Sequence, residues 1–190
     1  MSYHFKMKQG IILLAEDSST DQFIFKKALE KSKCFNGLYM VSNSFDALEY
    51  LGRSGKFTDP QTSPKPNLML LDSQIPGISV IKLLKVIKRD PIVRSIPVVV
   101  WGTSLSQGDE NEFYCLGAIG IVTKPEHCDQ YIDTVHALEQ IWLSKAKQEL
   151  NKQMSGQKCP TRFINRLKEG FEYIWPEGRG TPKNANGVTR

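Results

Sequence analysis

The sequence predicts an α/β protein with a doubly wound, five-stranded parallel sheet and a C-terminal helical extension. Two observations support this fold class. Five short apolar runs alternate along the chain with segments whose apolar residues recur at helical spacing. The strands are separated by helices rather than by hairpin turns, so they run parallel and bury both faces of the sheet under helices.

The five predicted strands are short apolar runs, and several stop at a charged or hydroxyl-bearing residue. They cover residues 11–15, 38–41, 67–71, 96–101 and 119–122. Helices are predicted at 19–33, 44–52, 78–89 and 108–116, and a last one begins near Asp129 and continues toward Gly156. Ser19 with Gln22 forms the predicted capping box of the first helix, and Ser44 is the predicted cap of the second. In the third, Ile81, Leu84, Val86 and Ile87 are expected to face inward.

Charge divides the chain into a near-neutral domain at 8–144 and a basic helical extension with a disordered tail at 145–190. Residues 1–144 hold 15 Lys and Arg against 16 Asp and Glu, whereas 145–190 hold 10 against 4. The apolar face of a predicted amphipathic helix after Pro160 is expected to pack on the domain or on a partner subunit rather than on a membrane. The tail is too short for an ordinary DNA-binding domain, so no nucleic-acid partner is expected.

The sequence shows no pattern typical of a signal peptide, a membrane span, a zinc site or a disulfide framework. The N-terminal apolar run is too short for a signal peptide or a membrane span, which predicts a soluble, cytoplasmic protein. The four cysteines and three histidines lack the spacing of a zinc site or a disulfide framework.

The residues that carry chemistry follow the strands. Glu16 and Asp17 follow the first strand, Asp72 the third, Thr103 the fourth and Lys124 the fifth. Reactive groups of open parallel sheets gather beyond the carboxyl ends of the strands. Three neighbouring carboxylates repel one another, and a hard divalent ion such as Mg²⁺ relieves that repulsion and leaves positions for phosphate oxygens. A lysine beside them offers a positive charge to an incoming phosphoryl group.

Four motifs in this order resemble the CheY-like receiver domain of response regulators. They are IILLAED at 11–17, NLMLLDSQIPG at 67–77, IPVVVWGTS at 96–104 and LGAIGIVTKP at 116–125. The loop at 53–66 and the segment before the fourth strand are most similar to the stand-alone receivers that partner cyanobacterial phytochromes. The resemblance implies the flavodoxin-like strand order 2-1-3-4-5.

The resemblance also implies roles for individual residues. Asp72 would be the phosphoacceptor in a two-component phosphorelay, and a sensor histidine kinase would be the donor. Glu16, Asp17, Asp72 and the backbone carbonyl of Gln74 would hold Mg²⁺. Lys124 would pair with the phosphoryl group.

A receiver of this kind assists its own phosphorylation and dephosphorylation but is not a turnover enzyme. It would signal through contact with an unknown downstream protein and would form a homodimer through the fourth helix and the fifth strand. The Lys124–Pro125 bond is a candidate for the cis form.

Two switch positions depart from the family pattern. Gly102 stands where the family places Thr or Ser, and Ile121 stands where it places an aromatic residue. Thr103 or Ser104 is the candidate substitute for the missing hydroxyl. The alternative function is a pseudo-receiver, an interaction module that signals without phosphorylation.

Overall fold

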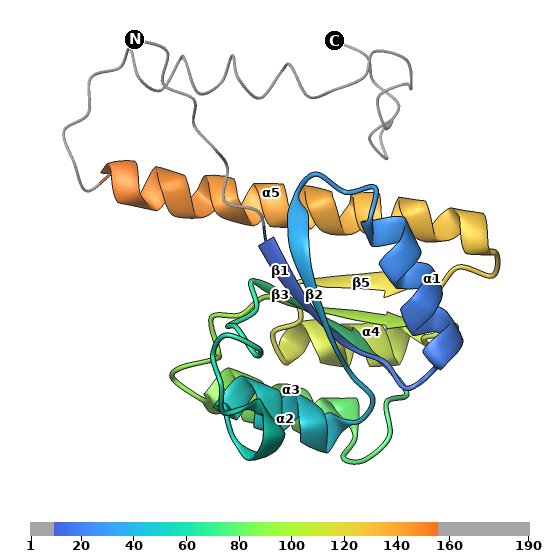
Figure 1. The fold of residues 1–190 in the computed structure, drawn as a ribbon, viewed down its shortest axis with the longest axis horizontal. Coiled ribbons are helices and arrows are strands. Elements are labelled where there is room, and N and C mark those ends of the chain that lie inside the picture. The colour runs from blue at the N-terminus through green and yellow to red at the C-terminus, as the bar shows by residue number, and fades with distance from the viewer. Residues whose placement is uncertain (1–9, 156–190) are drawn as a thin grey trace, which may run out of the picture. The chain divides into compact units, whose positions relative to one another are not determined.

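The computed structural model describes residues 10–155, of which residues 10–146 form one parallel sheet covered by helices on both faces (Figure 1). The strand order is β2-β1-β3-β4-β5, as the resemblance to receiver domains implied, and every neighbouring pair is parallel. The strands are β1 (Gly10–Ala15), β2 (Phe35–Val41), β3 (Leu68–Asp72), β4 (Val98–Gly102) and β5 (Gly120–Thr123).

Helices α1 and α5 cover one face of the sheet, and α2, α3 and α4 cover the other (Figure 1). The helices are α1 (Ser19–Leu29), α2 (Ser44–Gly52), α3 (Val80–Arg89), α4 (Gln107–Cys115) and α5 (Tyr131–Ser155), with two short 3₁₀ turns at Gly55–Phe57 and Cys128–Gln130. The predicted C-terminal extension of the last helix is present as far as Ser155. The predicted helix after Pro160 and the disordered tail lie outside the described residues.

Strand side chains alternate between two apolar cores, one on each face of the sheet. Leu71 and Val100 pack into the core beneath α2, α3 and α4. Leu70 and Trp101 pack into the core beneath α1 and α5. Burial on both faces explains why these strands are almost entirely apolar until they reach their carboxyl ends.

Several predicted details of the helices are wrong. Ser18, not Ser19, caps α1, because its hydroxyl accepts a hydrogen bond from the Asp21 N–H at 3.2 Å. Asn43 caps α2 by accepting from the Asp46 N–H. Ser44 is instead buried inside the first turn, where its hydroxyl accepts from the Ile78 N–H at 2.7 Å.

The inward face of α3 also differs from the prediction. Val86 is 47% exposed, because Val80, Leu83, Leu84 and Ile87 already form the buried stripe of this helix. In the segment that follows β5, the Lys124–Pro125 bond is trans, as are all the other peptide bonds of the described part of the chain. None of the described helices is both long and apolar enough to span a bilayer.

Candidate functional site

Three carboxylates meet at the carboxyl ends of β1 and β3. Glu16 and Asp17 directly follow β1, and Asp72 is the last residue of β3, the neighbouring strand. One carboxylate oxygen from each residue lies within 4.8 Å of the other two. Glu16 and Asp72 are buried, whereas Asp17 is exposed, so the cluster opens to solvent on the Asp17 side.

Lys124 follows β5 and brings a positive charge to this cluster. Its Nζ lies 2.7 Å from Glu16 Oε2, 3.3 Å from Asp72 Oδ1 and 3.4 Å from Asp21 Oδ2. The ammonium also lies 5.1 Å from the centre of the Trp101 ring, a cation–π contact. The sheet therefore brings four of the five residues predicted at the strand ends, Glu16, Asp17, Asp72 and Lys124, into one cluster, whereas Thr103 is exposed.

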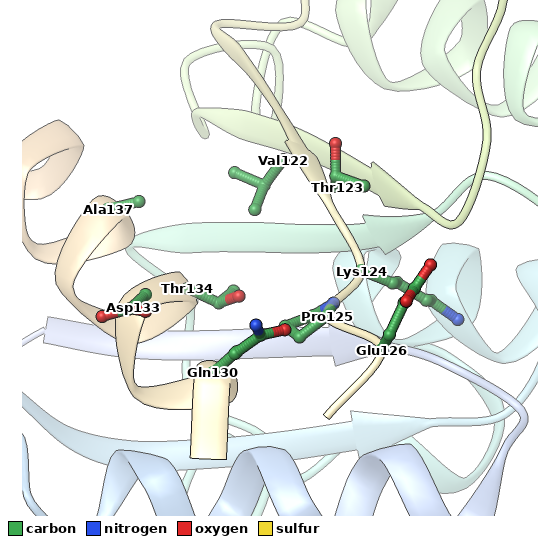
Figure 2. A pocket seen from close by; sticks show the side chains of 9 residues that line it. All are labelled: Val122, Thr123, Lys124, Pro125, Glu126, Gln130, Asp133, Thr134 and Ala137. Atoms are coloured by element: carbon green, nitrogen blue, oxygen red, sulfur yellow. The ribbon is translucent and has the colours of Figure 1, made fainter. Parts of the chain in front are cut away.

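An open hollow of about 520 Å³ lies on the other side of the Lys124 backbone, between the end of β5 and the start of α5. Figure 2 shows the Lys124 side chain extending away from Asp133, Thr134 and Ala137, the α5 residues that line this hollow. Lys124 therefore borders the hollow, while its ammonium lies among the carboxylates of the acidic cluster.

Sequence reasoning missed Asp21 and Tyr131, which complete the charge network. Asp21 lies in the first turn of α1, and its Oδ1 accepts a hydrogen bond of 2.7 Å from the hydroxyl of Tyr131, the first residue of α5. The resulting chain of contacts runs from Asp72 through Lys124 and Asp21 to Tyr131. No signal in the sequence indicated this pair, because Asp21 and Tyr131 are 110 residues apart and meet only in the folded chain.

Burial and mutual repulsion perturb the ionisation of this pocket. Burial is the main cause that raises the pKa of Glu16, and the Asp72 charge adds to it, while Lys124 and the Ser18 N–H oppose the shift. Burial alone would lower the pKa of Lys124, but the carboxylates of Glu16, Asp72 and Asp21 outweigh it and raise that pKa. Lys124 is therefore held firmly as a cation.

The donor set fits a hard divalent cation. One ammonium faces three carboxylates, and Asp17 adds a fourth at the rim. Glu16 Oε1 accepts from the Ser18 N–H at 2.9 Å, and the buried Oε2 pairs with Lys124 Nζ at 2.7 Å. Because the carboxylates outnumber the ammonium, the oxygens of Glu16, Asp17 and Asp72 are suited to an ion that prefers oxygen ligands.

Gln74 lies beside the cluster, in the turn after β3. Its backbone N–H donates to Asp72 Oδ1 at 3.2 Å. Within the described part of the chain, no backbone N–H donates to its carbonyl oxygen. The predicted role of this carbonyl as a metal ligand stays a prediction.

The β4 side of the pocket differs from the lysine side. Gly102 is the buried last residue of β4, and a Cβ built on it would lie 2.1 Å from the Ser73 hydroxyl oxygen. Thr103 and Ser104 are exposed, and the structure gives neither hydroxyl a hydrogen bond to another described residue. Ile121 packs against the core beneath α2, α3 and α4.

Comparison with known proteins identifies relatives of this chain. Residues 12–136 match the family described as the response regulator receiver domain. The chain is 32% identical over 133 residues to the response regulator Rcp1 of Synechocystis sp., an alignment that covers 70% of this chain and 88% of Rcp1.

Solved structures give the same result. The phosphorylated cyanobacterial phytochrome response regulator RcpA superposes with a TM-score of 0.65 and 30% identity over 73% of this chain and 96% of RcpA. The Mn²⁺-bound form of Rcp1 superposes with a TM-score of 0.63 and 31% identity over 70% of this chain and 94% of Rcp1. The chain therefore belongs to the response regulator receiver domain family of two-component systems and is similar to receivers that serve cyanobacterial phytochromes.

Proposed function

We propose that the protein is a phosphoacceptor response regulator that receives a phosphoryl group on Asp72 from a sensor histidine kinase. The observation that carries this proposal is the position of Lys124, whose Nζ lies 3.3 Å from Asp72 Oδ1 inside a cluster of carboxylates. A cation held against a buried acceptor carboxylate stabilises the charge that accumulates on a transferring phosphoryl group.

The two oxygens of Asp72 have different surroundings. Oδ1 accepts from the Gln74 N–H and faces Lys124, while Oδ2 has no hydrogen bond or ion pair with a described side chain or backbone group. Oδ2 is therefore the oxygen free to attack. The P–N bond of a phosphohistidine breaks, a P–O bond to Asp72 forms, and the imidazole nitrogen keeps the bonding electrons and takes up a proton.

Glu16, Asp17 and Asp72, with the Gln74 carbonyl, would hold Mg²⁺. The ion would supply positive charge to phosphoryl oxygens that Lys124 does not reach. The Mn²⁺ named for the similar Rcp1 structure supports a divalent ion in this class of pocket. Because Asp72 is itself the acceptor, each chain would carry one phosphoryl group at a time, and the protein would assist its own phosphorylation and dephosphorylation without acting as a turnover enzyme.

The phosphorylated protein is proposed to signal in the cytoplasm by binding a downstream protein and a second copy of this chain. Tyr114 of α4 is 50% exposed, Ile119 before β5 is 40% exposed, and Ile121 of β5 is partly buried. Exposed apolar side chains gathered around one helix and one strand favour a protein interface.

The second candidate is a pseudo-receiver that binds partners without phosphorylation. It is favoured by Gly102 and Ile121, which carry neither the hydroxyl nor the aromatic ring that the family uses at these positions. This candidate predicts the same fold and a cation-binding pocket, but no covalent change at Asp72.

Labelling with a small phosphodonor separates the two candidates. We expect wild-type protein incubated with Mg²⁺ and acetyl phosphate to gain the mass of one phosphoryl group, and Asp72→Asn to gain none. Asp59→Asn is the matched control, because Asp59 is exposed in the loop after α2 and accepts only local hydrogen bonds. Failure of wild type to label, or labelling of Asp72→Asn at the wild-type rate, would reject the phosphoacceptor function.

A further inference from the structure

The space beside Gly102 is filled by the side chain of Ser73. A Cβ on Gly102 would lie 2.1 Å from Ser73 Oγ and 3.0 Å from Ser73 Cβ. Two atoms that are not bonded to each other cannot lie 2.1 Å apart. The Ser73 hydroxyl therefore occupies the volume that the side chain of any larger residue at position 102 would need. Ser73 and Gly102 are therefore complementary in shape.

Backbone hydrogen bonds hold Ser73 in this place. Its N–H donates to the carbonyl of Trp101 at 2.8 Å, which ties the residue to the end of β4. The next N–H, that of Gln74, donates to Asp72 Oδ1. Ser73 is thus fixed between the acceptor carboxylate and the strand that carries Gly102.

Gly102 and Ser73 lie at the end of β4, which is between β3, the strand that ends at Asp72, and β5, the strand that Lys124 follows. Asp72 pairs with Trp101 across β3 and β4, and the Lys124 N–H donates to the Gly102 carbonyl at 2.9 Å. The Ser73 hydroxyl makes no hydrogen bond to another residue in the range 10–155, so its donor is unused. Ser73 directly follows the acceptor Asp72, so its free hydroxyl could donate a hydrogen bond to a phosphoryl group bound there.

A phosphoryl group on Asp72 needs donors on more than one side. Lys124 approaches from β5, and the carboxylate cluster lies toward β1. The β4 side has no side chain at 102, and Thr103 is exposed. A charged oxygen left without a donor on that side would lose the stabilisation of a charge-assisted hydrogen bond.

We propose that the Ser73 hydroxyl donates a hydrogen bond to the phosphoryl group on Asp72, in place of a hydroxyl on residue 102. This inference rests on the proposed function of Asp72. The hydroxyl would then come from the residue that follows the acceptor and not from the end of β4.

The rate of labelling by acetyl phosphate with Mg²⁺ tests this inference. We expect Ser73→Ala to label roughly 10- to 100-fold more slowly than wild type, the range for one lost hydrogen bond to a charged group. Thr103→Ala should lose less than Ser73→Ala. Ser54→Ala, at an exposed serine that makes no side-chain cap, controls for the substitution itself.

The exchange variant Ser73→Gly/Gly102→Ser distinguishes a chemical role from a structural one. It returns a hydroxyl to the same volume from the other strand, so it should label faster than Ser73→Gly alone. Labelling of Ser73→Ala at the wild-type rate, or a larger loss in Thr103→Ala, would overturn the role of Ser73 while leaving the phosphoacceptor intact. Absence of labelling in wild type would overturn the proposed function and this inference with it.

Discussion

The two sides of the pocket are built in different ways. On the β5 side, Lys124 reaches three carboxylates, and a hydrogen bond from Tyr131 to Asp21 extends the network to the start of α5. On the β4 side, Gly102 contributes no side chain, and Ser73 fills the vacant volume. The first side depends on charge, whereas the second depends on shape.

The difference shows what strand-end residues determine. Parallel strands bring their carboxyl ends together, so charged residues at the ends of nearby strands lie close to one another, as Glu16, Asp72 and Lys124 do. A small residue at a strand end leaves a space, and a neighbouring segment can fill it. The lysine side should therefore be sensitive to loss of charge, and the glycine side to changes in volume.

The largest expected effect is on the lysine side. Lys124→Met leaves buried Glu16 and Asp72 without their cation, and we expect it to lower the free energy of unfolding by about 3–5 kcal/mol without divalent ions. Urea unfolding measures the change, and excess Mg²⁺ should restore part of it.

Lys56→Met is the matched control for this substitution. Lys56 pairs with Asp46 at 2.8 Å, but its side chain is 63% exposed, so its loss should cost about 1 kcal/mol or less. Equal losses in the two variants would mean that charge does not hold the lysine side together.

A smaller effect is expected where the network reaches α5. Tyr131→Phe removes the hydroxyl that donates to the Asp21 carboxylate, a hydrogen bond to a charged group, and should cost about 1.5–3 kcal/mol. Burial and the Asp21 carboxylate also raise the pKa of Tyr131, so its hydroxyl stays protonated at neutral pH. Thermal or urea unfolding gives the measurement.

Tyr50→Phe provides the comparison for that variant. The Tyr50 hydroxyl donates to the neutral carbonyl of Pro64 at 2.8 Å, and its loss should cost about 0.5–1.5 kcal/mol. If Tyr50→Phe and Tyr131→Phe lowered the free energy of unfolding equally, the charge of Asp21 would add nothing to its hydrogen bond with Tyr131.

Much of the fold and part of the site follow from the sequence alone. Buried strands are apolar along their length and stop at charge, so the five strands and the gathering of Glu16, Asp72 and Lys124 were predictable, whereas the strand order followed from the resemblance to receiver domains. Helix caps were not, because Ser18 and Ser19 are chemically equivalent and only backbone geometry selects between them.

The residues that the sequence did not indicate are set by tertiary packing. Asp21 and Tyr131 are separated by 110 residues and meet only because α1 and α5 cover the same face of the sheet. Ser73 is next to the acceptor in sequence, but its relation to Gly102 depends on the pairing of β3 with β4. Contacts between side chains on different helices or strands leave no pattern in a single sequence.

Calorimetric titration of the wild-type protein with Mg²⁺ tests most directly the central claim that this acidic pocket holds a divalent cation. We expect one ion per chain and weaker binding to Asp17→Asn, whose exposed carboxylate is not part of the core. Burial raises the pKa of Glu16 above its ordinary 4.5, so protons should compete with Mg²⁺ as the pH falls through that raised value. Absence of binding at neutral pH, or an affinity that neither Asp17→Asn nor acid changes, would contradict the account.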